Sequence, residues 1–551
     1  MREPMWLKPS RIVFVLSAAC AAYAAASMNR AFERRAQFSA DLGDGTYRNP
    51  VLFGDFSDPD AIYFAGHYLL VASTFGRAPG LTLLRSTDLV NWEFLPQPLQ
   101  KLVPEERFRS PRHADGVWAP SIREHAGELF IFYPDPDTGI YVISARDPEG
   151  PWSAPRLLLA GRGLIDPCPF WDDDGRAYLI HAWAKSRAGF NNRLTLHEMA
   201  SDTSRLLDEG ATLIDGDTLS GYRTLEGPKF YKRDGWYYVF APAGGVRDGF
   251  QAVFRARHVR GPYEPRIVLA QGKTRVNGPH QGAWVETRSG QSWFLHFQEL
   301  SAFGRVVHLQ PMRFENGFPV IGNDREGDGV GEPVARHAKP SGTLPPSNSG
   351  LAPSDEFDGA RLAESWQWSS NFSSSWYSLR ARPGFLRLYA QRLPSDGTLW
   401  SSAAVLSQRL QGPRAEFRTR LDARTLDVGT RAGLVVLGDN YRWIGIERDA
   451  QGFALGLVEY QRANLNARER WLERRRIEDP ELDLAAEVDP NGLVRFAYGA
   501  AGKRQTRIGD AFAARPLGRW VGARIGIFCT RPTRATRESS ADFAWFRVRR
   551  P

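Results

Sequence analysis

The sequence has very little cysteine: three residues in 551 positions. Cys20 lies in an N-terminal apolar stretch, and Cys168 and Cys529 are far apart along the chain. This spacing offers no disulfide framework and none of the paired-cysteine patterns that bind zinc. We therefore expect the chain to be held together by its hydrophobic core.

Long apolar runs are also scarce. The N-terminal run IVFVLSAACAAYAAAS (12–27) follows a basic segment, ends in small residues, and is shorter than the roughly 20 apolar residues that a membrane span needs. It predicts a secretory signal and no stable membrane span. A lipoprotein signal is the weaker alternative, because Ser17 stands where a lipobox before Cys20 has leucine. We interpret residues 1–36 as a signal peptide and N-terminal extension, and expect a periplasmic or extracellular protein.

The sequence lacks a block of one charge sign, although its net charge is +9. Basic residues are scattered along the chain, and the dense run ARERWLERRR (467–476) contains acids as well. Nucleic-acid binding usually needs a basic stripe or cluster. We therefore expect no nucleic-acid partner and interpret this run as a solvated strand or loop.

The length and composition predict two all-β domains. A chain of 551 residues exceeds what one hydrophobic core usually supports. With 52 Gly, 37 Pro and 12% aromatic residues, the composition is typical of many short strands joined by turns.

One pattern recurs five times: a polar or aromatic residue, a short linker, an apolar strand, a turn with glycine, and an apolar-aromatic strand. The copies begin at Asp58, Trp118, Asp166, Glu226 and His280. Their turn glycines are Gly66, Gly127, Gly175, Gly235 and Gly290. Copies spaced by 48 to 60 residues suit four-stranded blades. The repeat predicts a five-bladed β-propeller over residues 37–335.

The five leading residues are expected to meet near the propeller axis. The innermost strands of all blades surround one central channel, so equivalent positions at their starts converge. An aspartate before proline often only starts a turn. Because Asp58, Asp166 and Glu226 share one phase of the repeat, we instead predict that they form a reaction site.

Six motifs in a fixed order cover the whole predicted propeller: NPVLFGDFSDPDAIYFAGHYLLVASTF (49–75), GVWAPSI, GLIDPCPFWDDDGRAYL, LEGPKFYKRDGWYYVF, GPHQGAWVET and GRVVHLQPM. In these motifs the sequence resembles glycoside hydrolase family 43, the inverting β-xylosidases and α-L-arabinofuranosidases. Two segments, FSDPD and WAPS, differ from the motifs that are frequent in the family. The substrate preference of better-known members therefore does not transfer directly to this sequence.

The resemblance implies catalytic roles for the three acids. Asp58 matches the general base, Glu226 the general acid, and Asp166 the residue that orients the acid and raises its pKa. Inversion needs an ionised carboxylate and a protonated carboxyl on opposite faces of the sugar, roughly 6.5–9.5 Å apart. A third carboxylate beside the acid helps it to keep its proton.

Other matches imply a binding site around these acids. Arg305 matches an arginine that reaches the sugar and the acidic cluster, with a strand-edge salt bridge as the alternative. Phe75 and Trp118 match aromatic walls of the sugar site, with core packing as the alternative. His280 matches an axial histidine that in several members helps to hold a hydrated, structural calcium, with a core histidine as the alternative. No organic cofactor is implied.

A second domain follows a segment rich in proline, glycine and serine. We interpret residues 336–352 as a linker and residues 353–551 as a β-sandwich, because strand-like alternation returns there. This half resembles the concanavalin-like C-terminal domain of family β-xylosidases, which lends an aromatic residue to the sugar pocket. GRWVGARIGIFC makes Trp520 the candidate for that cap.

Together these observations predict an inverting, exo-acting hydrolase. Its expected partner is a carbohydrate: plant cell-wall (arabino)xylan or its oligosaccharides, from which it releases terminal β-D-xylosyl or α-L-arabinofuranosyl units. An endo-α-1,5-L-arabinanase and a catalytically silent carbohydrate-binding propeller are the alternatives. The choice between xylose and arabinose and the oligomeric state stay open at this point.

Overall fold

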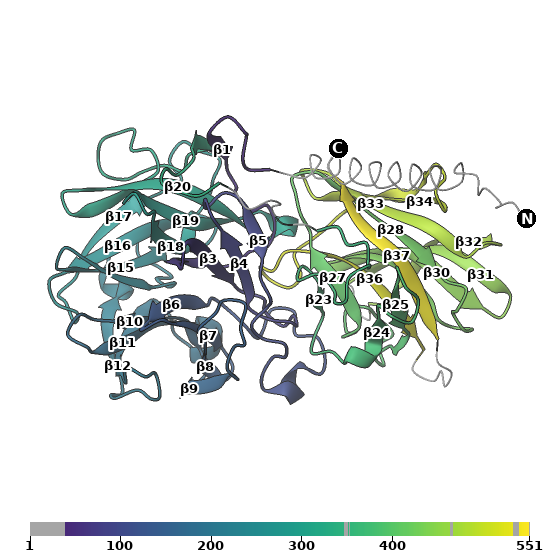
Figure 1. Cartoon of the computed structure of the whole chain (residues 1–551), viewed down its shortest axis with the longest axis horizontal. Helices are drawn as coiled ribbons and strands as arrows, with labels where there is room; N and C mark the ends of the chain where they lie inside the picture. The colour runs from purple at the N-terminus through teal and green to yellow at the C-terminus, as the bar shows by residue number, and fades with distance from the viewer. Residues whose placement is uncertain (1–38, 346–350, 352, 463–466, 533–538, 550–551) are drawn as a thin grey trace, which may run out of the picture.

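The computed structural model describes residues 39–345, 351, 353–462, 467–532 and 539–549. The predicted signal peptide and extension, 1–36, lie outside these residues. The described chain is all-β and contains a five-bladed propeller and a β-sandwich that lie side by side (Figure 1), which confirms the predicted fold class.

Each blade is a four-stranded antiparallel sheet whose strands follow one another in the sequence. The first blade has β2 (Asp60–Phe64), β3 (His67–Ala72), β4 (Thr82–Ser86) and β5 (Trp92–Phe94), and the second has β6 (Ser121–His125), β7 (Glu128–Asp135), β8 (Gly139–Ala145) and β9 (Arg156–Ala160). The third has β10 (Leu164–Trp171), β11 (Ala177–Trp183), β12 (Arg193–Met199) and β13 (Ala211–Asp215), and the fourth has β14 (Lys229–Arg233), β15 (Trp236–Ala243), β16 (Phe250–Ala256) and β17 (Glu264–Leu269). The fifth has β18 (His280–Glu286), β19 (Ser292–Glu299), β20 (Arg305–Glu315) and β21 (Phe318–Ile321).

The predicted hairpin turns join the first two strands of every blade. Gly66, Gly127, Gly175, Gly235 and Gly290 all have positive φ, between 70° and 91°. Glycine adopts this conformation without the steric cost that a Cβ atom brings. The turns therefore fix the register of each hairpin. They also place the residue that precedes each first strand at an equivalent position in every blade.

The ring closes between the first and fifth blades. β2 lies beside β18, and Leu52 forms an isolated bridge with Val307 of β20. A two-stranded sheet of β1 (Thr46–Arg48) and β22 (Arg336–Ala338) adds a second link between the two ends of the propeller. β22 falls within the stretch that the sequence assigned to the linker, so the ordered propeller segment extends past residue 335.

The second domain consists of two stacked sheets. One has the order β23-β27-β36-β29-β30-β31-β32, with β26 beside β36, and the other has the order β24-β25-β37-β28-β33-β34-β35. The first sheet comprises β23 (Gln367–Trp368), β26 (Gln391–Arg392), β27 (Val405–Arg409), β29 (Arg431–Leu437), β30 (Asn440–Asp449), β31 (Gly452–Gln461), β32 (Arg470–Ile477) and β36 (Arg524–Arg531). The second comprises β24 (Tyr377–Ser378), β25 (Leu386–Tyr389), β28 (Ala415–Asp422), β33 (Glu481–Val488), β34 (Leu493–Ala500), β35 (Thr506–Ala513) and β37 (Ser540–Arg549).

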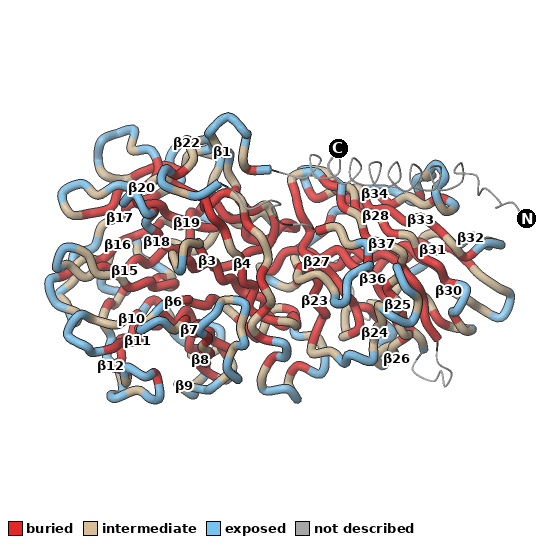
Figure 2. The backbone as a smooth tube through the Cα atoms, in the orientation of Figure 1, coloured by how far each residue is buried: buried red, intermediate tan, exposed pale blue. Residues whose placement is uncertain are grey.

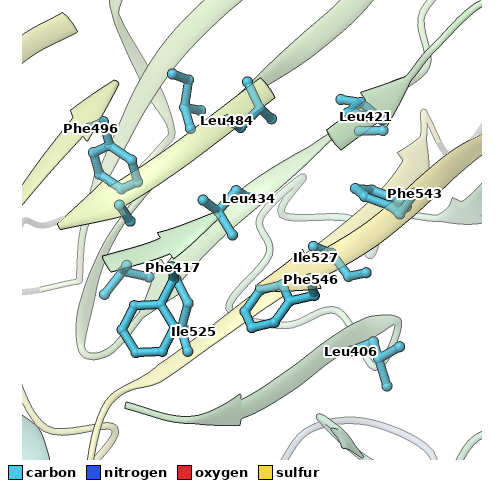
Figure 3. Packing of buried hydrophobic residues seen from close by; sticks show 14 of the residues in the cluster. Leu406, Phe417, Leu421, Leu434, Leu484, Phe496, Ile525, Ile527, Phe543 and Phe546 are labelled. Carbon is cyan, nitrogen blue, oxygen red and sulfur yellow. The ribbon is translucent and has the colours of Figure 1, made fainter. Parts of the chain in front are cut away.

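Apolar side chains fill the space between the two sheets. Leu434 and Ile527 come from one sheet and Phe417, Leu484 and Phe546 from the other, and all five are buried in one cluster (Figure 3). Along β28, polar residues alternate with the core residues, as expected for a sheet that has one face in the core and one in solvent, whereas β29 and β36 are buried on both faces. Figure 2 shows the resulting buried interiors of both domains.

Helical segments are short and lie between strands. They are η1 (Glu105–Phe108), α2 (Lys185–Ala188), η2 (Gly216–Thr218), η3 (Ser301–Phe303) and η4 (Ser374–Trp376). Within the described ranges, none of these helices is long and apolar enough to cross a membrane.

Asp55 connects the two domains through hydrogen bonds. One carboxylate oxygen accepts a hydrogen bond from the backbone N–H of Gly522, in the sandwich, at 2.9 Å, and the other accepts from the N–H of Arg305 at 3.1 Å. Arg409 of β27 donates to the carbonyl oxygen of Asp55 at 2.6 Å. These bonds hold the segment after Trp520 against the first residue of β20.

Candidate active site

A cavity of about 390 Å³ opens where the inner strands of the propeller face the sandwich. Its walls bring together seven of the eight predicted site residues: Asp58, Phe75, Trp118, Asp166, Glu226, Arg305 and Trp520. The eighth, His280, lies behind Glu226 and contacts it. A cavity of this size lies within the range typical of small-ligand sites.

Asp58 is held two residues before β2 by hydrogen bonds to both of its carboxylate oxygens. Arg305 donates to Oδ1 at 2.5 Å and the hydroxyl of Ser73 donates to Oδ2 at 2.7 Å. The residue is 4% exposed, and its φ of 56° lies in the left-handed region, where aspartate is tolerated better than most residues. These contacts suit an ionised carboxylate, which is the form that a general base needs.

Asp166 occupies the corresponding place in the third blade, at a register shift in β10, and it has a similar φ of 54°. Burial raises the pKa of its carboxyl, and the charges of Glu226 and Asp58 raise it further, to about 8. The N–H of Gly227 donates to Oδ2 at 2.8 Å and opposes this rise in part. At neutral pH the cluster of Asp58, Asp166 and Glu226 therefore carries fewer than three negative charges.

Glu226 precedes β14 and reaches the cavity with 24% of its side chain exposed. Its Oε1 lies 3.0 Å from Nε2 of His280, which orients the carboxyl from behind. The next residue, Gly227, has φ of 61°, and a Cβ atom there would come within 2.9 Å of the side chain of Gln281. Because residue 227 is glycine, one turn can present the side chain of Glu226 to the cavity and the N–H of Gly227 to Asp166.

Arg305 begins β20 and supplies positive charge beneath the acids. Its side chain is buried, its guanidinium lies 4.6 Å from the ring centroid of Phe297, and it pairs with Asp58. Burial alone would lower its pKa, but the surrounding carboxylates, Asp58 first among them, raise the pKa above its usual value. The residue stays cationic, and its salt bridge with Asp58 is buried at the start of β20.

Three aromatic side chains line the cavity, Phe75, Trp118 and Trp520. Phe75 is 2% exposed, and Trp118 donates its indole N–H to the carbonyl oxygen of Ala114 at 2.9 Å. Trp520 reaches across from the sandwich and meets Trp118 edge to face, with ring centroids 5.4 Å apart. Aromatic rings of this kind bind the apolar faces of ligands while the polar groups fix orientation.

The residues around His280 are compatible with the expected calcium only if the ion is held through water molecules. Calcium takes six to eight oxygen ligands, and no group of three or more His, Cys, Asp or Glu side chains that could hold a metal gathers anywhere in the described ranges. Nδ1 of His280 is buried without a hydrogen-bond partner among the described atoms. The nitrogen could accept from a water carried by a hydrated cation, so the residues fit an ion held through water rather than a protein cage.

Four further residues contribute to the site although sequence reasoning did not single them out. Ser73 bonds Asp58, while Gln281, Glu299 and Arg519 line the cavity. Gln281 and Arg519 are direct neighbours of predicted residues, His280 and Trp520, so the motifs GPHQGAW and GRWVGAR could have indicated them. Ser73 directly follows β3, and Glu299 is the last residue of β19. Neither stands at a leading position of the repeat, so no sequence motif indicates them.

Comparisons with known proteins agree with this architecture in both domains. Residues 47–319 match the model of glycosyl hydrolases family 43. Residues 354–549 match the beta xylosidase C-terminal concanavalin A-like domain.

Full-length relatives and a solved structure cover most of the chain. A relative from Xylanibacter ruminicola is 37% identical over 490 residues, which is 89% of this chain and 87% of its own length. A beta-xylosidase from Formosa agariphila is 30% identical over 541 residues, 89% of this chain and 88% of its own. The crystal structure of the GH43 BlXynB protein from Bacillus licheniformis superposes with a TM-score of 0.80 at 26% identity, covering 92% of this chain and all of that one.

Proposed function

Because this chain belongs to glycosyl hydrolase family 43, we propose that it releases single terminal pentose units, β-D-xylosyl or α-L-arabinofuranosyl, from plant cell-wall (arabino)xylan and its oligosaccharides. One observation carries this proposal: three carboxylic acids from three blades line one cavity that the sandwich domain walls on another side. The family and the relatives support glycosyl hydrolysis, and the name of the Formosa relative supports xylose as the sugar.

The proposed chemistry is a single displacement with inversion. Asp58 removes a proton from a water molecule as that water attacks the anomeric carbon, and Glu226 protonates the departing glycosidic oxygen. Both bonds change as positive charge develops on the sugar ring. The carboxylate of Asp58, held beside the cavity, favours that charge electrostatically.

Two residues tune the acids in this proposal. Asp166 and Glu226 share one buried site in which two negative charges disfavour each other, so the pair retains a proton near neutral pH that Glu226 can deliver to the leaving group. Arg305 keeps the carboxylate of Asp58 oriented and charged between proton transfers. His280 holds the far oxygen of Glu226, which leaves the other oxygen free to face the leaving group.

The position of Trp520 supports exo action over cleavage within a chain. An endo-arabinanase needs a groove that is open at both ends, whereas here Arg519 and Trp520 of the second domain stand at the cavity wall. A silent binding protein would have no use for a base and an acid around the same cavity. Both alternatives are therefore less well supported than exo-hydrolysis.

Export and a hydrated calcium also belong to the proposal. The basic and apolar N-terminal segment supports export to the periplasm or the cell exterior. A calcium ion held through water near His280 would add positive charge behind Glu226 and rigidify the axis.

Two measurements test the function. Purified protein is assayed on p-nitrophenyl β-D-xyloside, p-nitrophenyl α-L-arabinofuranoside and arabinoxylan oligosaccharides, and inactivity on all of them rejects an exo-pentosidase. Proton NMR of the first sugar formed reports its anomer. Inversion produces α-xylose from a β-xyloside, and initial β-xylose contradicts the single displacement.

A further inference from the structure

A second concave site, of about 530 Å³, lies on the sandwich, and it shares no lining residue with the active-site cavity. Its walls contain six basic residues and one acidic residue. The lining side chains are Arg418, Arg420, Asp483, Gly502, Lys503, Arg504, Gln505, Trp545, Arg547 and Arg549. We call this site the basic groove.

The basic groove is the outer face of the sheet that contains β28 and β37. Along β28, Phe417 and Leu421 point into the core while Arg418 and Arg420 alternate with them. Side chains of successive strand residues point to opposite faces. Figure 3 shows Phe417 and Phe546 within the core of the sandwich, so the arginines next to them in sequence face away from it.

The strand register sets like charges against one another. Arg418 of β28 lies directly opposite Arg547 of β37 in an antiparallel pair. Like charges at opposed positions destabilise a sheet. A fold that serves stability alone would place a neutral or acidic residue at one of them, so the arrangement indicates a surface shaped for a ligand.

Neighbouring carboxylates neutralise only part of this charge. Arg420 pairs with Asp483 at 2.7 Å, and Arg547 pairs with Glu356 at 2.7 Å. Four cations of the groove form no ion pair with any described carboxylate: Arg418, Lys503, Arg504 and Arg549. In addition, Nε of Arg418 is buried without a hydrogen-bond partner in the described part of the chain.

A partly exposed tryptophan stands among these cations. The guanidinium of Arg547 lies 4.5 Å from the ring centroid of Trp545, and that of Arg420 lies 5.8 Å from it. An indole face offers an apolar platform for a flat or ring-shaped group, and guanidinium groups bind carboxylates through paired hydrogen bonds. This combination recognises a ring that carries an anionic group better than it recognises a bare ion.

We propose that the basic groove binds an acidic polysaccharide through its uronic acid units, with the sugar ring on Trp545 and the carboxylate on Arg418 and Arg549. The choice of a sugar over other anions rests on the proposed function, because a xylan-degrading enzyme meets xylan chains that carry uronic acid side groups. The groove then holds the polymer while the separate cavity cleaves chain ends.

The test measures binding of the full chain without hydrolysis. In an Asp58→Asn background, dissociation constants are determined by affinity electrophoresis and calorimetry for glucuronoxylan, for the same polymer after carboxyl reduction, and for neutral arabinoxylan. The groove variants are Arg418→Gln/Arg549→Gln and Trp545→Ala. The control, Arg146→Gln/Arg288→Gln, removes the same charge from two exposed propeller arginines, and thermal melts verify that every variant is folded.

We expect both groove variants to weaken glucuronoxylan binding by about tenfold or more, and the control by less than about twofold. Carboxyl reduction of the polymer should cause a similar loss, and binding should weaken as salt is added. Equal binding by parent and groove variants overturns the proposal. Tighter binding of double-stranded DNA or phosphatidylglycerol vesicles than of glucuronoxylan overturns it too. Because no step requires turnover, failure of the proposed activity would show separately, in the aryl pentoside assay.

Discussion

The indole rings of Trp118 and Trp520 meet edge to face with their centroids 5.4 Å apart, although one belongs to the propeller and the other to the sandwich. Pairs in this geometry contribute about 0.5–1.5 kcal/mol beyond simple burial. Two residues after Trp520, Gly522 is bonded to Asp55 of the propeller. The second domain is thus fastened to the first beside the cavity that it helps to enclose.

Replacing Trp520 should therefore weaken substrate binding more than it slows the chemical step. For Trp520→Ala we expect kcat/KM on p-nitrophenyl β-D-xyloside to fall about tenfold or more, with most of the change in KM, because a wall of the cavity is lost. Trp471→Ala is the control, since Trp471 is 37% exposed on β32 and does not line the cavity. An unchanged KM would show that Trp520 does not touch the sugar.

Asp58→Asn should abolish activity on every substrate. The amide keeps the size of the side chain but cannot accept a proton from water, and general acid–base groups contribute about 10²–10⁴-fold. Initial rates are compared on an aryl pentoside with a good leaving group and on xylobiose. Equal rates for Asp58→Asn and the parent enzyme would reject Asp58 as the base.

Glu226→Gln should cause a loss that depends on the leaving group. A 2,4-dinitrophenolate departs without a proton, whereas an alkoxide from xylobiose needs one, so the variant should be far more impaired on xylobiose. Glu299→Gln provides the matched control, because Glu299 also lines the cavity. Its effect should be the same for both substrates, and a similar dependence on leaving group would move the acid role away from Glu226.

Breaking the pair of Arg305 and Asp58 should destabilise the fold. Arg305→Met leaves a buried carboxylate without its partner, and removing one member of such a pair costs about 3–5 kcal/mol. The double variant Arg305→Met/Asp58→Asn should recover part of that loss in urea unfolding while remaining inactive. If both variants unfold at the same urea concentration as the parent enzyme, the pair has no role in stability.

Much of the site could be predicted from the sequence because it follows the repeat. Asp58, Asp166 and Glu226 stand at equivalent positions before the turn glycines of their blades. Because the hairpins of all blades have the same geometry, these positions come together at one cavity. Ser73 and Glu299 lie at or just beyond the far ends of second strands, where the pattern carries no polar signal. Their contribution depends on packing between blades, which no single segment encodes.

The clustering of basic side chains on the folded surface was harder to predict. Basic residues are scattered along the sequence, yet the register of β28 and β37 places Arg418 opposite Arg547, and the turn at 502–504 adds two more cations. Segments that are distant in sequence form one groove because an antiparallel sheet pairs them. A linear scan for charge runs cannot detect such a surface.

The pH dependence of stability tests the state of Asp166. Burial, together with the charges of Glu226 and Asp58, raises its pKa from 3.8 in the unfolded chain to about 8 in the folded one. Between these two values the folded protein binds more protons than the unfolded one, so the free energy of unfolding must fall as the pH rises. The stabilising contribution is complete below about pH 4 and lost above about pH 8.

The variant Asp166→Asn isolates this contribution, because its amide side chain does not titrate. The melting temperature of the parent enzyme minus that of Asp166→Asn should therefore decrease steadily from about pH 5 to about pH 8. Asp173→Asn, at a side chain that is 85% exposed, is the control and should give a nearly constant difference. Parallel melting curves for the parent enzyme and Asp166→Asn would mean that Asp166 is already ionised at the acidic end of this range and does not take up the proton that relieves the charge beside Glu226.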